Sequence, residues 1–238
     1  MLIDKVVDFQ VHVQKIMNDH FEVVYDAEYL IGYHVKHSPH YAKYLWTNEN
    51  PTELTDEQVF LKAMFDLISP VLEADSLYKK ISRTQPKPDS WRASERLIRP
   101  CGNLAHETYN YTERLKLYLN SAKSLCNGIE STYLLDSIIS KRLKTFKTRF
   151  KHIMAYRNYL VHAGPKIIDP FSELSYMEIA AITGHSDIWF IFNNSFDEAK
   201  HVWRANAKLV RDDMVQTLAE VKSVNEDILR IRGFKFAS

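Results

Sequence analysis

Several features that mark common protein classes are scarce or missing in this sequence. Only two cysteines occur, Cys101 and Cys126, and their separation does not match a zinc site, so we expect a reducing compartment such as the cytoplasm. Only six glycines occur, which fits a helical chain better than a turn-rich β protein. No apolar run approaches ~20 residues, so we expect no membrane span. Because charged and apolar residues alternate at the N-terminus, we also expect no signal peptide.

Motifs for several kinds of catalysis are missing as well. The sequence contains no glycine-rich phosphate loop, no Cys/His zinc pattern and no nucleophile elbow. We therefore expect no bound metal and no cofactor. The remaining composition is that of an ordinary globular protein, with 45% hydrophobic residues, 26% charged residues and a net charge of +1.

One group of histidines raises the question of a metal site. His34, His37 and His40 follow one another at intervals of three residues. Pro39 interrupts the helix that would align them, and no acidic pair nearby completes a ligand set. An aromatic- and histidine-rich surface that continues through Tyr41 to Trp46 therefore explains these histidines better than a metal.

Apolar residues three and four positions apart predict helices over most of the chain. The predicted helices cover residues 3–36, 55–72 with a kink at Pro70, 103–127, 131–162, 175–184 and 195–233. The apolar, β-prone segment 187–193 is predicted to be a short strand or an extended piece. We therefore expect an all-α fold, an up-and-down helical bundle.

Prolines suggest one internal boundary. Residues 82–102 contain Pro86, Pro88 and Pro100 and are predicted to form a long connection. The sequence thus divides into an N-terminal helical extension, residues 1–100, packed on a core bundle, residues 101–238.

The predicted helix 131–162 carries a charge where an apolar residue is expected. Its buried stripe consists of Ile139, Leu143, Phe146, Phe150, Ile153 and Leu160, which lie four, three, four, three and seven residues apart. The position skipped by the last interval is Arg157. A permanent charge on a buried stripe has to be paired, or has to face a wet cleft or an interface. Arg157 is therefore either half of a core salt bridge, for example with Glu107, or part of a functional site.

Two polar side chains follow Arg157. Asn158 and His162 share a helix face at positions i and i+4, whereas Arg157 and His162 are about 140° apart in an ideal helix. Gly164 and Pro165 end the helix, and a loosened last turn would bring His162 towards Arg157. Alternatively, His162 only binds free carbonyls at the helix end, where the dipole favours its protonated form.

The same helix is strongly basic. Between Tyr133 and His162 there are seven cations and one acid, a balance of +6 in a chain whose net charge is +1. Such local asymmetry suits a polyanion such as RNA, unless acidic neighbours neutralise it. The candidate RNA-binding residues are Lys144, Lys147, Arg149 and Lys151.

These residues carry a family resemblance. The pattern Arg157-Asn158-x-x-x-His162, near the end of a long helix, resembles the Arg-x4–6-His signature of the HEPN superfamily, in which a polar residue often follows the arginine. The resemblance covers about residues 100–232, and the N-terminal helices have no counterpart in it. It implies a HEPN-type bundle and a metal-independent ribonuclease that leaves cyclic-phosphate ends, with a composite active site between the two subunits of a homodimer.

Carried over to this sequence, the resemblance implies that Arg157 binds the phosphate, that Asn158 assists and that His162 is the acid or base. Many family members act in phage defence or as toxins neutralised by a partner protein, an antitoxin. Others have lost catalysis. Two hypotheses follow: an endoribonuclease, or a non-catalytic helical scaffold that binds RNA, a nucleotide or a partner protein.

Overall fold

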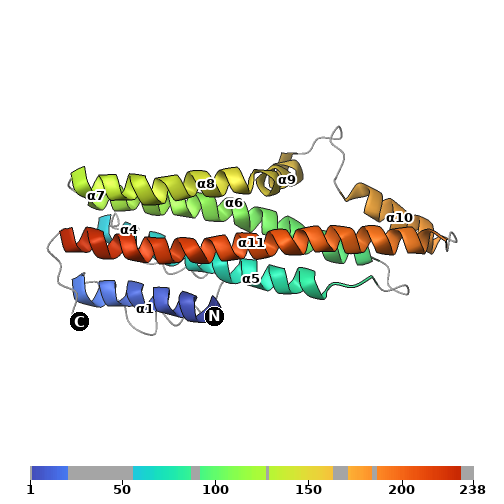
Figure 1. Cartoon of the computed structure of the whole chain (residues 1–238), viewed down its shortest axis with the longest axis horizontal. Helices are drawn as coiled ribbons and strands as arrows, with labels where there is room; N and C mark the ends of the chain where they lie inside the picture. Colours follow the sequence, from blue (N-terminus) through green and yellow to red (C-terminus); the bar gives the residue numbers. More distant parts are fainter. Residues whose placement is uncertain are drawn as a thin grey trace, which may run out of the picture.

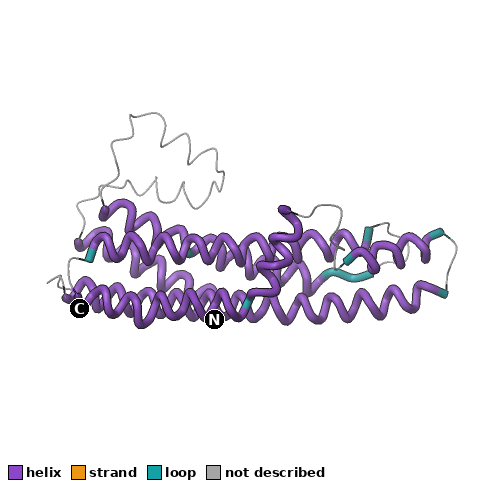
Figure 2. Tube along the Cα trace, turned by 90° about the horizontal axis from the view of Figure 1, so that it is seen from above, coloured by secondary structure: helices purple, strands orange, loops and turns teal. Residues whose placement is uncertain are grey.

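Helices form the regular structure of this protein. The computed structural model describes residues 2–20, 56–86, 92–126, 129–162, 171–183 and 187–231. Within these ranges every regular element is a helix and none is a strand. The helices pack side by side into an elongated bundle (Figures 1 and 2). The expectation of an all-α helical bundle is therefore confirmed.

Two long helices run through the bundle, α6 (Ala93–Leu125) and α11 (Ile188–Ile231). With 44 residues at 1.5 Å each, α11 is roughly 66 Å long and extends along the bundle from end to end (Figure 1). The earlier part of the chain adds α1 (Leu2–His20), α4 (Asp56–Asp66) and α5 (Ile68–Arg83). The later part adds α7 (Ile129–Leu134), the π-helix η1 (Leu135–Ser140), α8 (Lys141–Arg149), α9 (Lys151–His162) and α10 (Ser172–Ile182). None of the described helices combines the length and the apolar character that a membrane crossing requires.

The start of α11 corrects the expectation for residues 187–193. That segment is helical from Ile188 onwards, seven residues before the predicted helix start at Ser195. Trp189, Phe192 and Phe196 lie three and four residues apart, and Phe192 and Phe196 are fully buried. A short apolar run is compatible with a strand or a helix, and here the packing of these rings on one face decides for the helix.

The start of α6 corrects the prediction of a long connection over residues 82–102. The helix already begins at Ala93, with Pro100 inside it, although no side chain of its own caps it. The buried carboxylate of Glu178, in α10, does so instead. It accepts hydrogen bonds from the backbone N–H groups of Ala93 (2.5 Å) and Ser94 (3.1 Å) and from the Ser94 hydroxyl. A negative group at this end also stabilises the helix dipole.

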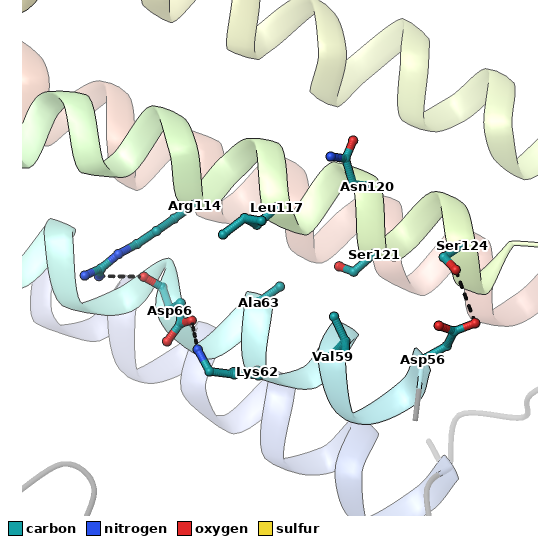
Figure 3. Close-up of a pocket in the computed structure, with 10 residues that line it drawn as sticks. All are labelled: Asp56, Val59, Lys62, Ala63, Asp66, Arg114, Leu117, Asn120, Ser121 and Ser124. Atoms are coloured by element: carbon teal, nitrogen blue, oxygen red, sulfur yellow. Dashed lines mark hydrogen bonds and ion pairs between the residues drawn. The ribbon is translucent and has the colours of Figure 1, made fainter. Parts of the chain in front are cut away.

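A proline also explains the boundary between α4 and α5. The predicted kink at Pro70 is present as a break at Leu67, three residues earlier. Pro70 has no N–H to donate to the carbonyl of Asp66, four residues before it. That carbonyl instead accepts a hydrogen bond from Arg114 of α6 at 2.9 Å (Figure 3).

One buried hydrophobic cluster includes side chains from both ends of the chain, from Val6 in α1 to Ile228 in α11. The predicted division between residues 100 and 101 falls inside α6, and the cluster combines residues from both sides of it. The division into an N-terminal extension and a core bundle stays a prediction. The described N-terminal helices α1, α4 and α5 do pack on the later ones.

A buried ion pair joins the basic helix to α11. Arg142 of α8 lies 2.7 Å from the Oδ1 atom of Asp213 in α11, which is 3% exposed. The guanidinium of Arg149 contacts the same oxygen at 3.3 Å. Arg142 also donates from Nε to the Thr217 hydroxyl at 3.0 Å. Removing one partner of such a pair leaves an uncompensated buried charge.

We predict that Asp213→Ala lowers the free energy of unfolding by about 3 kcal/mol, because Arg142 loses its buried counter-ion and keeps only the partly exposed Glu220 at 3.5 Å. Urea unfolding followed by circular dichroism measures this. The matched control is Asp212→Ala, one residue away and half exposed, which should cost less than about 1 kcal/mol. Equal effects of the two substitutions would contradict the structural role of Asp213.

A second buried polar group, His12, packs α1 against α11. Burial lowers the pKa of His12 from 6.5 to about 4, and the charge of Lys222 adds to this effect, while Asp8 opposes it. Glu226 approaches the ring at 3.7 Å, too far for a hydrogen bond, so burial dominates. Since the folded-state pKa is depressed, the contribution of neutral His12 to stability is complete above about pH 6.5 and is lost as the pH falls towards 4.

We therefore predict that, between pH 7 and pH 4, wild type loses about 3 kcal/mol of unfolding free energy relative to His12→Leu, which cannot titrate. Denaturant unfolding of both proteins across this range measures the difference, and carboxylates that titrate in both proteins cancel. A difference that does not change with pH would show that His12 is not held neutral in the folded state.

Candidate functional site

The predicted basic helix is present but is divided into segments. η1 interrupts it at residues 135–140, and a bend at Phe150 (φ −104°, ψ 21°) separates α8 from α9. The predicted stripe is buried from Ile139 to Ile153, which confirms it there, but Leu160 is 39% exposed. After the bend, Tyr156 takes the buried position and packs on Trp203 with 5.3 Å between ring centroids. The bend thus turns a different face of α9 towards the core.

Arg157 is held by an aromatic ring rather than by an acid. Its guanidinium carbon lies 4.1 Å from the centroid of the Tyr109 ring in α6, which is a cation–π contact. Nη1 donates to the Asn158 side-chain oxygen at 3.2 Å, and the buried Nε atom has no hydrogen-bond partner. The salt bridge to Glu107, which was the structural alternative for Arg157, is not formed, and Glu107 accepts a hydrogen bond from Asn110 at 3.2 Å. Among the described residues, none offers Arg157 a carboxylate.

The three predicted catalytic residues are only partly brought together. Arg157 and Asn158 are in contact, and both Asn158 and His162 are exposed. α9 remains helical through His162, so the expected loosening of its last turn does not occur up to that residue. Arg157 and His162 therefore point about 140° apart around α9, and no hydrogen bond joins them. Gly164 and Pro165 lie outside the described residues.

The basic surface separates into paired and unpaired cations. None of Lys144, Lys147 and Lys151 forms an ion pair with a carboxylate of the described chain. Arg142 and Arg149 both contact Asp213, so part of the basic character is used for packing. Of the predicted RNA-binding residues, Arg149 thus has a structural partner, while the three lysines are free to contact a polyanion.

Two residues that position α9 were missed by the sequence analysis. Tyr109 supports Arg157, and Gly102 lets α9 approach α6 closely, because a Cβ atom there would come within 3.1 Å of the Leu160 side chain. A glycine inside a helical pattern is a signal for such a close approach and could have identified Gly102. Nothing local to Tyr109 distinguishes it from the other tyrosines.

No metal-binding cluster of histidine, cysteine or carboxylate side chains occurs in the ranges that the structure covers. His34, His37 and His40 lie outside these ranges. Cys101 and Cys126 are both free and buried. Burial raises the pKa of the Cys101 thiol, so this side chain stays protonated and unreactive at neutral pH.

A groove between α4 and α6, with a volume of about 320 Å³, is an alternative to α9 as the place where a ligand binds (Figure 3). Its charged groups largely satisfy one another. Lys62 is paired with Asp66, and Asp56 accepts a hydrogen bond from Ser124 at 3.2 Å. With two acids and two cations in its lining, this groove has no net preference for a charged ligand.

We predict a coupling of about 1 kcal/mol between Arg157 and Tyr109, because a partly buried cation over an aromatic face contributes on that scale. A double-mutant cycle with Arg157→Met and Tyr109→Leu, read by denaturant unfolding, measures it. The matched pair is Arg157→Met with Tyr133→Leu, since Tyr133 is an exposed tyrosine without this contact, and its coupling should be near zero. A coupling near zero for both pairs would show that Tyr109 does not hold Arg157.

Comparisons with known proteins leave the site to be judged on its own geometry. No family model, curated protein or solved structure matched this chain. The resemblance to the HEPN superfamily therefore rests on Arg157, Asn158 and His162 and on their place at the end of α9. What the site can do has to be inferred from these residues and from the charges around them.

Proposed function

We propose that the protein is a metal-independent endoribonuclease of the HEPN type. The observation that carries this proposal is the state of Arg157, a guanidinium without a carboxylate partner in the described chain, held in place by the Tyr109 ring. A structural arginine at a half-buried position would be expected to pair with an acid. Within the described chain, Arg157 pairs with no acid, and it lies next to the exposed Asn158 on a basic segment of the bundle.

The chemistry needs no group beyond RNA and side chains. The 2′-hydroxyl attacks the adjacent phosphorus, so that a new P–O bond forms and the bond to the 5′-oxygen breaks. His162 accepts the proton of the 2′-hydroxyl and returns a proton to the leaving 5′-oxygen, since an imidazole ring can do both. Arg157 binds the phosphate and stabilises the charge that develops on it. The free amide nitrogen of Asn158 orients the phosphate or the hydroxyl.

A second copy of the chain completes the site in this proposal. Because Arg157 and His162 point in different directions in one chain, the arginine of one copy would meet the histidine of the other in a homodimer. Leu160 and Val161, 39% and 46% exposed, lie next to His162 and offer apolar area for such a contact. Lys144, Lys147 and Lys151 would bind the RNA backbone beside the site that the two copies form.

The biological setting belongs to the same proposal. We infer that the protein acts in the cytoplasm, in phage defence or as a toxin, as many members of the family that it resembles do, and that a protein partner, an antitoxin, would then block the shared site. A second candidate function, a non-catalytic scaffold that binds RNA, a nucleotide or a partner protein, is favoured by one observation, the separation of Arg157 from His162 within one chain.

We predict that the wild type cuts single-stranded RNA in EDTA to products with cyclic-phosphate ends, and that Arg157→Ala and His162→Ala each reduce the rate at least about a hundredfold. Gel analysis of end-labelled RNA gives the rate, and treatment of the products with a phosphatase before and after acid opening identifies the ends.

The matched control is His152→Ala, an exposed histidine of the same helix that contacts Asn206 and is not placed in the site. It should cut at the wild-type rate. If folded wild type leaves several RNAs intact, or if His152→Ala and His162→Ala lose activity equally, the ribonuclease assignment fails and the scaffold becomes the better description.

A further inference from the structure

A second basic site lies between the end of α5 and the first turns of α6. These helices pack side by side there (Figure 1). The cavity has a volume of about 690 Å³ and is larger than the groove between α4 and α6. It is lined by Leu77, Lys80, Arg83, Thr84, Gln85, Arg96, Arg99, Pro100 and Asn103.

The lining contains four cations and no carboxylate. Arg83 is exposed and forms no ion pair with any acid in the described ranges. Lys80 is 3.8 Å from Glu73, and Arg99 is paired with Glu95, which also contacts Arg92. Even if Glu73 and Glu95 are counted, the charge of this set is +2. The lining and its two nearest acids together therefore carry a net positive charge.

The other described cavities have a different character. The groove in Figure 3 contains two acids and two cations, and the cavity between α1 and α11 contains Asp8 and Glu226 beside its cations. Their charged groups have partners close by, such as Lys222 with Asp8 at 2.9 Å. Of these three cavities, the one between α5 and α6 has the lining with the largest net positive charge.

The donors in this cavity suit phosphate groups. Arginine presents a planar set of N–H donors that matches phosphate oxygens, and three arginines can bind more than one phosphate at once. The Thr84 hydroxyl, which donates to the Lys80 carbonyl at 2.9 Å, and the amides of Gln85 and Asn103 add neutral polar groups. Several phosphates in a row, as in a nucleic acid backbone, would match this lining.

The cavity and the candidate active site share one helix. At 100° per residue, Arg96, Arg99 and Asn103 lie within about 60° of one another on α6. Gly102 and Tyr109, which contact α9, begin about 60° further round the helix, and half-buried His106 lies between the two sets. A strand that leaves Arg157 and passes over α6 would therefore reach Arg99 and then Arg83.

We propose that this cavity, with Arg83 and Arg99 as its main phosphate ligands, binds the backbone of the single-stranded RNA at a distance from the cleavage point. This inference deepens the proposed function and rests on it for the identity of the ligand. The site contributes affinity and holds the strand in position but takes no part in the chemistry. Its removal should weaken RNA binding without changing the cleavage rate of saturating RNA.

The test measures binding of a short, fluorescently labelled single-stranded RNA whose 2′-hydroxyls are methylated, so that cleavage cannot occur. Wild type is compared with Arg83→Gln/Arg99→Gln at several salt concentrations by anisotropy. The matched control Lys116→Gln/Arg230→Gln removes two exposed cations, each also near an acid, from other surfaces. A single Arg83→Gln variant, which breaks no ion pair, is included in case the double variant is unstable.

We expect the double variant to bind the RNA about tenfold more weakly than wild type, and the control less than about twofold more weakly. The slope of the logarithm of the binding constant against the logarithm of the salt concentration should become shallower by about 1.4 in the double variant, because two phosphate contacts are lost. This result supports the site even if wild type cuts no RNA, in which case only the ribonuclease proposal fails. Equal affinity of the double variant and the control overturns the site, even if wild type cuts RNA. A nucleoside triphosphate that binds wild type but not the double variant, with RNA binding unchanged, also overturns it and assigns the cavity to a nucleotide.

Discussion

The packing of α9 across α6 is the contact on which the candidate site depends. The bend at Phe150 directs α9 onto α6, Gly102 lets the two helices approach, and Tyr109 receives the guanidinium of Arg157. Without the bend, the face that carries Arg157 would follow the buried stripe of α8. Without the aromatic ring, a half-buried cation lacking a carboxylate would be difficult to accommodate.

The described cations of the basic helix fall into two groups: those that pair with an acid inside the bundle, and those that could bind an anion from outside. Arg142 and Arg149 share Asp213 and connect α8 to α11, as expected of charges that the bundle has to neutralise. Lys144, Lys147 and Lys151 have no such partner within the described chain and form a positive surface beside α9. The cavity between α5 and α6 adds a second one. Although the net charge of the protein is only +1, its described part thus presents two positive surfaces to which an anion could bind.

The sequence analysis predicted the structural features that are set by residues close together in the chain. It missed those that are set by contacts between residues far apart in the chain. The helical class followed from the spacing of apolar residues, and the predicted stripe is buried from Ile139 to Ile153 because a helix repeats its face every three to four residues. The start of α6 was wrong because its cap, Glu178, comes from another helix. The partner of Arg157 could not be predicted either, because an arginine interrupts an apolar stripe in the same way whether it contacts an aromatic ring or a carboxylate.

The central claim is that Arg157 and His162 act together although one chain holds them apart, and mixing two inactive variants tests it most directly. Arg157→Ala and His162→Ala are unfolded together, refolded as a mixture and assayed for RNA cleavage, with each variant refolded alone as the control. If the site is shared between two copies, half of the dimers are mixed and one of their two sites is intact, so about one quarter of the wild-type activity returns. No recovery in a mixture shown to contain mixed dimers would contradict a shared site.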